Sequence, residues 1–281
     1  MAAAWRLHGR QWKDNHYVYA VVSRRSRGIS IGLNLNPDKA CNFDCIYCQV
    51  NRRVPASIRY VNLKRLAEEL DTILRAERDG SLYQDPPFNA LPVAERGVRD
   101  IAFSGDGEPT GFRRFGEVVR VAASARLRFG LNSAKLILLT NATNLDKPAV
   151  RAALEEMDQN NGEIWAKLDA GTEKYFRKVN RSRVSIKEIL GNILGAARIR
   201  PLVIQSLWFQ IEGAAPPDDE IEAYCDRLAD LISNGGKLKL IQLHSIARDP
   251  AESQASPLTK DSLDRIAATV KRRVSVPIEV F

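Results

Sequence analysis

Apolar residues recur along this chain with two different spacings. Positions three and four apart predict helices over residues 63–78, 112–129, 148–157, 186–199, 218–233 and 259–271. Short runs that alternate or are wholly apolar predict strands over residues 29–35, 99–103, 135–139, 163–168, 202–211 and 238–243. Residues 80–97 carry three prolines and no period, so they predict a loop, and residues 274–281 predict a last extended segment.

Strands and helices alternate in this pattern, which is typical of repeated βα units and a parallel sheet. Right-handed crossovers curl such a sheet toward a barrel. Six units are too few for a closed barrel of eight strands. The pattern alone therefore leaves two alternatives, an open partial barrel and a doubly wound sheet.

The composition narrows the class of protein. With 281 residues, 44% hydrophobic and 27% charged, the chain can bury a large core, which excludes a disordered protein or a disulfide-stapled miniprotein. No apolar run approaches 18 residues, and the first ten residues lack the apolar stretch of a signal peptide. We therefore expect a cytoplasmic protein without a membrane span. The net charge of +8 permits a polyanionic partner such as RNA but does not require one.

Cysteines carry the clearest chemical signal. Three of the four lie within eight residues, at Cys41, Cys45 and Cys48, and none of the histidines is near them in the sequence. A closed zinc site takes four ligands, usually from paired knuckles, and this loop offers three. A [4Fe–4S] cluster normally takes one thiolate per iron, so three thiolates would leave one iron open to a substrate.

The spacing C-x-x-x-C-x-x-C, with the aromatic Tyr47 just before the last cysteine, resembles the radical S-adenosylmethionine (SAM) superfamily. This resemblance implies that Cys41, Cys45 and Cys48 hold one [4Fe–4S] cluster and that SAM chelates the open iron. It implies that an electron from the reduced cluster cleaves SAM to methionine and a 5′-deoxyadenosyl radical, which abstracts hydrogen from a substrate. A reductant such as flavodoxin or ferredoxin would supply that electron.

The resemblance also decides between the two folds that the pattern leaves open. It implies an α/β fold of the open partial (β/α)6 barrel type, with a parallel sheet. We expect a single radical SAM domain over residues 1–281, in which residues 1–28 form an N-terminal extension and the core begins at about residue 29.

Polar residues follow the predicted strands at their carboxyl ends, where barrel enzymes place their chemistry. After strand 99–103 comes Ser-Gly-Asp-Gly-Glu-Pro-Thr, which is similar to the family's Gly-Gly-Glu-Pro motif. That similarity implies that Gly105, Gly107 and Glu108 contact SAM.

Lys167 and Asp169 alternate with an apolar residue, so both should face the barrel interior. They would form either a mutual ion pair or contacts to SAM or the substrate. We predict Lys167, Asp169 and His244 as catalytic candidates. We predict four cofactor contacts besides those of the glycine turn: Tyr47, Asn141, Asp169 and Gln205.

Four segments resemble the wyosine-type branch of the superfamily: residues 103–110, 165–172, 179–181 and 241–248. Members of that branch rebuild a guanine of tRNA and carry a second cluster on further cysteines. This chain has only Cys225 left, which we expect to be a small buried hydrophobe on a helix.

Two classes of function therefore stay open. The chain could act on a small molecule or on a base of tRNA, where Arg52 and Arg53 after the cysteines could hold phosphate. Alternatively, it could be an activase that generates a radical on a partner protein.

Overall fold

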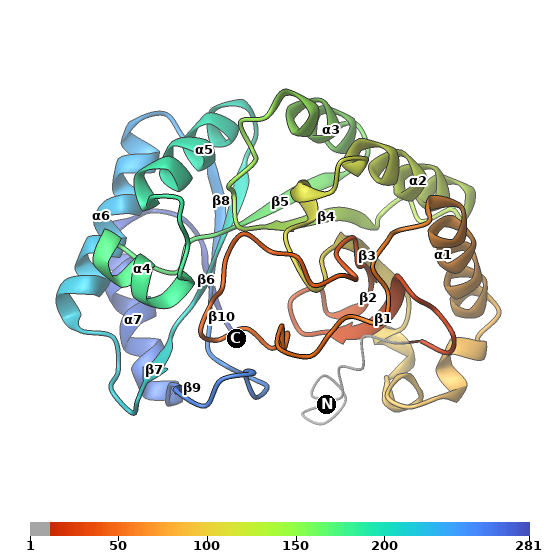
Figure 1. Cartoon of the computed structure of the whole chain (residues 1–281), viewed down its shortest axis with the longest axis horizontal. Coiled ribbons are helices and arrows are strands. Elements are labelled where there is room, and N and C mark those ends of the chain that lie inside the picture. The colour runs from red at the N-terminus through yellow and green to blue at the C-terminus, as the bar shows by residue number, and fades with distance from the viewer. Residues whose placement is uncertain (1–11) are drawn as a thin grey trace. The chain divides into compact units, whose positions relative to one another are not determined.

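The computed structural model describes residues 12–281, so the first 11 residues of the predicted N-terminal extension lie outside the described part (Figure 1). The main sheet has the strand order β1-β2-β3-β4-β5-β6-β8-β10. Its strands are β1 (Val18–Ser23), β2 (Gly28–Leu33), β3 (Val98–Phe103), β4 (Lys135–Thr140), β5 (Gly162–Lys167), β6 (Leu202–Leu207), β8 (Leu238–His244) and β10 (Ile278–Val280). β1 runs antiparallel to β2, whereas the pairs β2–β3, β3–β4, β5–β6, β6–β8 and β8–β10 are parallel.

Seven α-helices occur among the described residues. They are α1 (Leu63–Arg78), α2 (Phe115–Arg128), α3 (Pro148–Asp158), α4 (Glu173–Asn180), α5 (Ile186–Ile199), α6 (Asp218–Ser233) and α7 (Lys260–Arg273). Six of them confirm predicted helices, and the six predicted strands are found as β2, β3, β4, β5, β6 and β8. The α/β fold with a mostly parallel sheet is thereby confirmed.

The chain folds into two compact units. The first consists of the residues up to Cys41, Pro55–Leu139 and Pro148–Glu163; the second consists of Asn42–Val54, Thr140–Lys147 and Ile164–Phe281. In the first unit, α1, α2 and α3 follow one another along the strands β1 to β4 (Figure 1). In the second, α5, α6 and α7 are successive neighbours beside β6, β8 and β10. The single domain expected from the sequence stays a prediction.

Local sequence explains why the elements form where they do. Every residue of β2 is buried, as expected for a strand of a parallel sheet covered on both faces. α1 buries Leu66, Leu70 and Ile73 on one stripe. It begins after Asn62, whose side chain accepts the Arg65 N–H as an N-cap.

Two parts of the predicted pattern differ in the structure. The segment 202–211 was predicted as one strand, but β6 ends at Leu207 and β7 (Phe209–Ile211) pairs antiparallel with β9 (Ala255–Pro257) in a separate small sheet. At the end of β6 the Leu207 N–H donates to the Asp169 carboxylate at 2.9 Å, and the Trp208 N–H donates to the His244 carbonyl at 2.8 Å. The strand β1 and the helix α4 were not predicted.

Residues 80–97 form a connection with three short 3-10 turns, at Ser81–Gln84, Phe88–Ala90 and Val93–Glu95, which agrees with the predicted loop. No helix among the described residues is both long enough and apolar enough to cross a membrane.

Candidate active site

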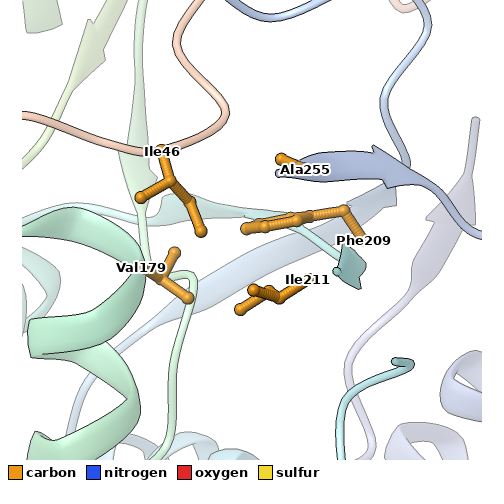
Figure 2. Packing of buried hydrophobic residues seen from close by; sticks show 5 residues of the cluster. All are labelled: Ile46, Val179, Phe209, Ile211 and Ala255. Atoms are coloured by element: carbon orange, nitrogen blue, oxygen red, sulfur yellow. The ribbon is translucent and has the colours of Figure 1, made fainter. Parts of the chain in front are cut away.

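The cysteine loop, defined here as residues 42–54 of the second unit, is anchored by an apolar side chain and by backbone hydrogen bonds. Ile46 is 2% exposed and packs in a buried cluster with Val179, Phe209, Ile211 and Ala255 (Figure 2). The Ile46 N–H donates to the Val179 carbonyl at 3.0 Å. The end of α4 and the β7–β9 sheet therefore fix the loop residue that follows Cys45.

Two sulfur atoms of the second unit accept hydrogen bonds from side chains. Asn180 Nδ2 lies 3.3 Å from Cys45 Sγ, and Arg52 Nη1 lies 3.1 Å from Cys48 Sγ. None of the four cysteines forms a disulfide in the structure. Desolvation and the nearby Asp169 charge raise the pKa of Cys45 to about 12, so binding a metal must displace its proton.

Asp169 is the centre of the polar network in this unit and is only 2% exposed. Its Oδ1 accepts the Leu207 N–H and lies 3.3 Å from Lys167 Nζ. Its Oδ2 accepts the Tyr47 hydroxyl at 2.5 Å and Asn180 Nδ2 at 3.2 Å. These four contacts occupy about all the lone-pair positions of a carboxylate. The structure thus brings together three of the predicted site residues and adds Asn180.

Lys167, the last residue of β5, is the remaining side chain of the Asp169 network. Its ammonium also lies over the Tyr47 ring, 5.2 Å from the centroid, and its side chain keeps 25% exposure. Desolvation and the Asp169 charge raise the pKa of Tyr47 well above its usual value, so its hydroxyl stays a donor at neutral pH. Lys167 has donor capacity left over, because an ammonium carries three donors.

The other predicted residues of this unit lie within or just after strands of the main sheet. Gln205 Nε2 donates to Gln242 Oε1 at 3.2 Å inside the β6–β8 pair. Asn141 follows β4, and its Nδ2 donates to Asn42 Oδ1 of the cysteine loop at 2.7 Å. His244 is buried at the end of β8, with its ring 6.0 Å from the Phe281 ring.

The glycine turn, residues 104–110, belongs to the first unit and packs on the segment that leads to Cys41. A Cβ at Gly107 would lie 1.9 Å from the Ala40 carbonyl, and one at Gly105 would lie 2.4 Å from Asn34 Oδ1. Only glycine permits this close approach. Glu108 is buried, and its Oε1 accepts both the Thr110 N–H and the Thr110 hydroxyl.

The cysteine loop carries sulfur ligands of the kind that an iron–sulfur cluster takes. Among the described residues, no three His, Cys, Asp or Glu side chains converge as ligands for one metal ion. A cluster spreads its thiolates over several irons, and its sulfur ligands commonly accept N–H hydrogen bonds, as Cys45 and Cys48 do here. Cys225 takes no part in this loop: it is fully buried on α6, where desolvation raises its pKa to about 11, as predicted for a buried hydrophobe.

The profile of the Radical SAM superfamily matches residues 35–204, and the chain belongs to this superfamily. It is a radical SAM enzyme, and the cofactors of the family are a [4Fe–4S] cluster and SAM.

One sequence relative and two solved structures illustrate the relationship. A UPF0026 protein of Helicobacter pylori (strain J99) is 25% identical over 248 residues, which are 88% of this chain and 71% of that protein. The structure of Streptococcus suis SuiB bound to S-adenosylmethionine matches with a TM-score of 0.59 at 14% identity. The match covers 88% of this chain and 49% of SuiB, so this chain spans about half the length of that protein.

The structure of TYW1 with a lysine-pyruvate adduct bound has a similar fold, with a TM-score of 0.56 at 17% identity over 89% of this chain and 74% of that one. At these identities the likeness shows the fold alone.

Asn180 is the member of the network that the sequence analysis did not assign. It lies in Val-Asn-Arg (179–181), which was singled out only as a family-like segment. That segment was the one available signal, because nothing in the local pattern connects residue 180 with Cys45 or Asp169.

Proposed function

We propose that this chain binds SAM at a cluster held by Cys41, Cys45 and Cys48, and cleaves it reductively to a 5′-deoxyadenosyl radical that abstracts hydrogen from a substrate. The observation that carries the proposal is the buried network linking Cys45, through Asn180, to Asp169 at the carboxyl end of β5. Polar groups at that end of parallel strands are where barrel enzymes act.

The cluster, when bound, would supply the electron that breaks the sulfur–carbon bond of SAM. The chain's own residues then bind and orient. Because Asp169 already accepts four contacts, we assign it to holding Tyr47 and Lys167 in place. Lys167, with donors to spare and part of its side chain exposed, is the group we assign to the SAM carboxylate or an anionic substrate group.

The glycine turn is the second proposed SAM element. Its close packing on residues 34–40 fixes the backbone of Gly105 and Gly107. Glu108, held by Thr110, is the carboxylate of this turn that we assign to the ammonium group of SAM.

Reductive SAM cleavage is the direct test. The chain is reconstituted anaerobically with iron and sulfide, mixed with SAM and dithionite, and assayed for 5′-deoxyadenosine. We expect reductant-dependent product from the wild type and from Cys225→Ala, and none from Cys45→Ala. Equal product from Cys45→Ala, or none from an iron-replete wild type, would contradict the proposal.

A base of tRNA is the substrate class that we test first. The net charge of +8 and the exposed Arg53 in the cysteine loop support it. Filter binding of bulk tRNA over a salt series should show affinity that falls steeply with salt. No binding at low salt would remove this class and favour a small molecule, whereas a stable complex with one protein would favour an activase.

We also propose one cluster, because only Cys225 remains and it is buried in α6. Iron analysis of the reconstituted chain should give about four irons. A reproducible value near eight would restore a two-cluster reaction of the wyosine type.

A further inference from the structure

Asn180, the last residue of α4, has a side chain placed between a proposed cluster ligand and the central carboxylate. The residue is 1% exposed. Its Nδ2 lies 3.3 Å from Cys45 Sγ and 3.2 Å from Asp169 Oδ2. The Tyr47 hydroxyl is also hydrogen-bonded to both side chains, so among the described residues Asn180 is one of two that link Cys45 to Asp169.

The chemistry around the amide fixes its orientation. Asp169 Oδ2 is an acceptor, and so is the Cys45 sulfur once it is a thiolate, so the NH₂ group with its two hydrogens must face them. The opposite orientation would place the Asn180 carbonyl oxygen against two acceptors.

This arrangement leaves Asn180 Oδ1 buried and without a hydrogen-bond partner in the described part of the chain. A buried unsatisfied oxygen disfavours folding. The contacts to Cys45 and Asp169 are thus kept at the expense of stability, which indicates a role besides holding the fold.

Backbone hydrogen bonds also hold the cysteine loop against the end of α4. The carbonyls of Val179 and Asn180, at the end of α4, accept the N–H groups of Ile46 and Asp44 at 3.0 and 3.1 Å. The carbonyls of a last helical turn have no partner within the helix, so the cysteine loop satisfies them here. Both neighbours of Cys45 are therefore tied to the segment that carries Asn180.

We propose that Asn180 is a positioning residue that donates an N–H···S hydrogen bond to the Cys45 thiolate and thereby raises the reduction potential of the cluster. The inference rests on the proposed function, in which Cys45 is a cluster ligand. A donor beside the sulfur stabilises the more negative, reduced state, and hydrogen bonds to sulfur are among the factors that set cluster potentials.

A redox titration followed by EPR, without SAM or substrate, tests the proposal. The variants are Asn180→Leu, which keeps the shape but loses the donor, and Asn192→Leu as a matched control. Asn192 lies on α5 in the same unit and donates to the carbonyls of Ala142 and Thr143, with no recorded sulfur contact. We expect the reduced-to-oxidised ratio of Asn180→Leu at a fixed potential to fall about tenfold, which is about 59 mV for a one-electron couple. The control should match the wild type.

An Asn180→Leu cluster with full iron content and the wild-type potential would overturn the proposal while leaving the proposed function intact. Failure of the wild type itself to form a cluster would instead contradict the proposed function. If Asn180→Leu does not retain iron, the sulfur contact is tested by pulsed EPR on the reduced wild type. For this experiment the protein is labelled with ¹⁵N in its asparagine side chains. A nitrogen coupling that persists in Asn192→Leu supports the sulfur contact, and its absence from the wild type refutes it.

Discussion

Two buried aspartates, one in each unit, show how differently the fold uses the same side chain. Asp100 lies near the start of β3 and accepts the Ser30 hydroxyl, and its Oδ2 has no hydrogen-bond partner among the described residues. Asp169 lies just past the end of β5 and has both oxygens engaged by Tyr47, Lys167, Asn180 and a backbone N–H. Both are at most 2% exposed.

The difference lies in position along the strand and in the partners. Desolvation is the main cause of the raised pKa of Asp100, and hydrogen bonds from Ser26 and Ser30 oppose this shift only in part, as do the charges of Arg25 and Lys135. Asp169 connects to a thiol, a phenol and an ammonium, which are groups with chemistry of their own. We therefore place the proposed active site by the carboxyl end of a parallel strand and not by burial and charge alone.

The largest effect should come from the cysteine loop that Asp169 faces. Replacing Cys45 by Ala removes a thiolate that would hold one iron, so we expect loss of the cluster and of SAM cleavage in a folded chain. Cys225→Ala, at a buried position on α6, should keep both the cluster and SAM cleavage. Iron content and 5′-deoxyadenosine yield measure the outcome, and an iron-replete, active Cys45→Ala chain would contradict it.

The next effect concerns SAM affinity. Asp169→Ala releases Tyr47 and Lys167 from their positions, and Glu108→Ala removes a carboxylate of the glycine turn. A hydrogen bond to a charged group contributes about 1.5–3 kcal/mol, so each change should weaken SAM binding roughly tenfold to a hundredfold without removing iron. Equilibrium binding of SAM to the reconstituted chains measures this, and unchanged affinity in both variants would refute the assignments.

Asp100→Asn should leave SAM affinity unchanged and alter how stability depends on pH. Because the pKa of Asp100 is raised on folding, the folded chain takes up this proton at a higher pH than the unfolded chain does. This group's contribution is therefore greatest in acid and is lost as pH rises through the folded pKa. The stability of the wild type relative to Asp100→Asn should decrease from pH 4 to pH 7 in urea unfolding, and a difference that grows with pH would show the sign to be wrong.

The smallest effect should come from the exposed ion pairs of Arg181, one of which is with Asp44 of the cysteine loop. Arg181 forms ion pairs with Glu252 at 2.7 Å and Asp44 at 3.4 Å, and it is about one-third exposed. Exposed ion pairs contribute less than about 1 kcal/mol. Arg181→Asn, which suits the left-handed backbone at this position, should therefore change the unfolding midpoint little and leave the iron content as it is. Loss of iron from this variant would mean that the loop depends on its exposed contacts as much as on its buried ones.

The elements predicted well are those whose signal is local. α1 and α5 have the predicted bounds because an amphipathic period and a capping residue, Asn62 or Ser185, coincide. The strands β2 to β6 and β8 were found because each is a short apolar run.

The missed elements depend on tertiary contacts. β1 is an edge strand that pairs with β2, α4 has only eight residues, and β6 ends at Leu207, whose N–H donates to Asp169. The same holds for the site. Cys45, Tyr47 and Asp169 could be selected by motif and strand position, but Asn180 is separated from Cys45 by 135 residues, and only folding brings them together.

EPR of the reduced chain with and without SAM tests the central claim most directly. If Cys41, Cys45 and Cys48 hold a cluster with an open iron that binds SAM, the wild type should give a cluster signal that changes shape when SAM is added, and Cys45→Ala should give neither. A wild-type signal that is indifferent to saturating SAM, or a SAM-sensitive signal that survives in Cys45→Ala, would contradict the account.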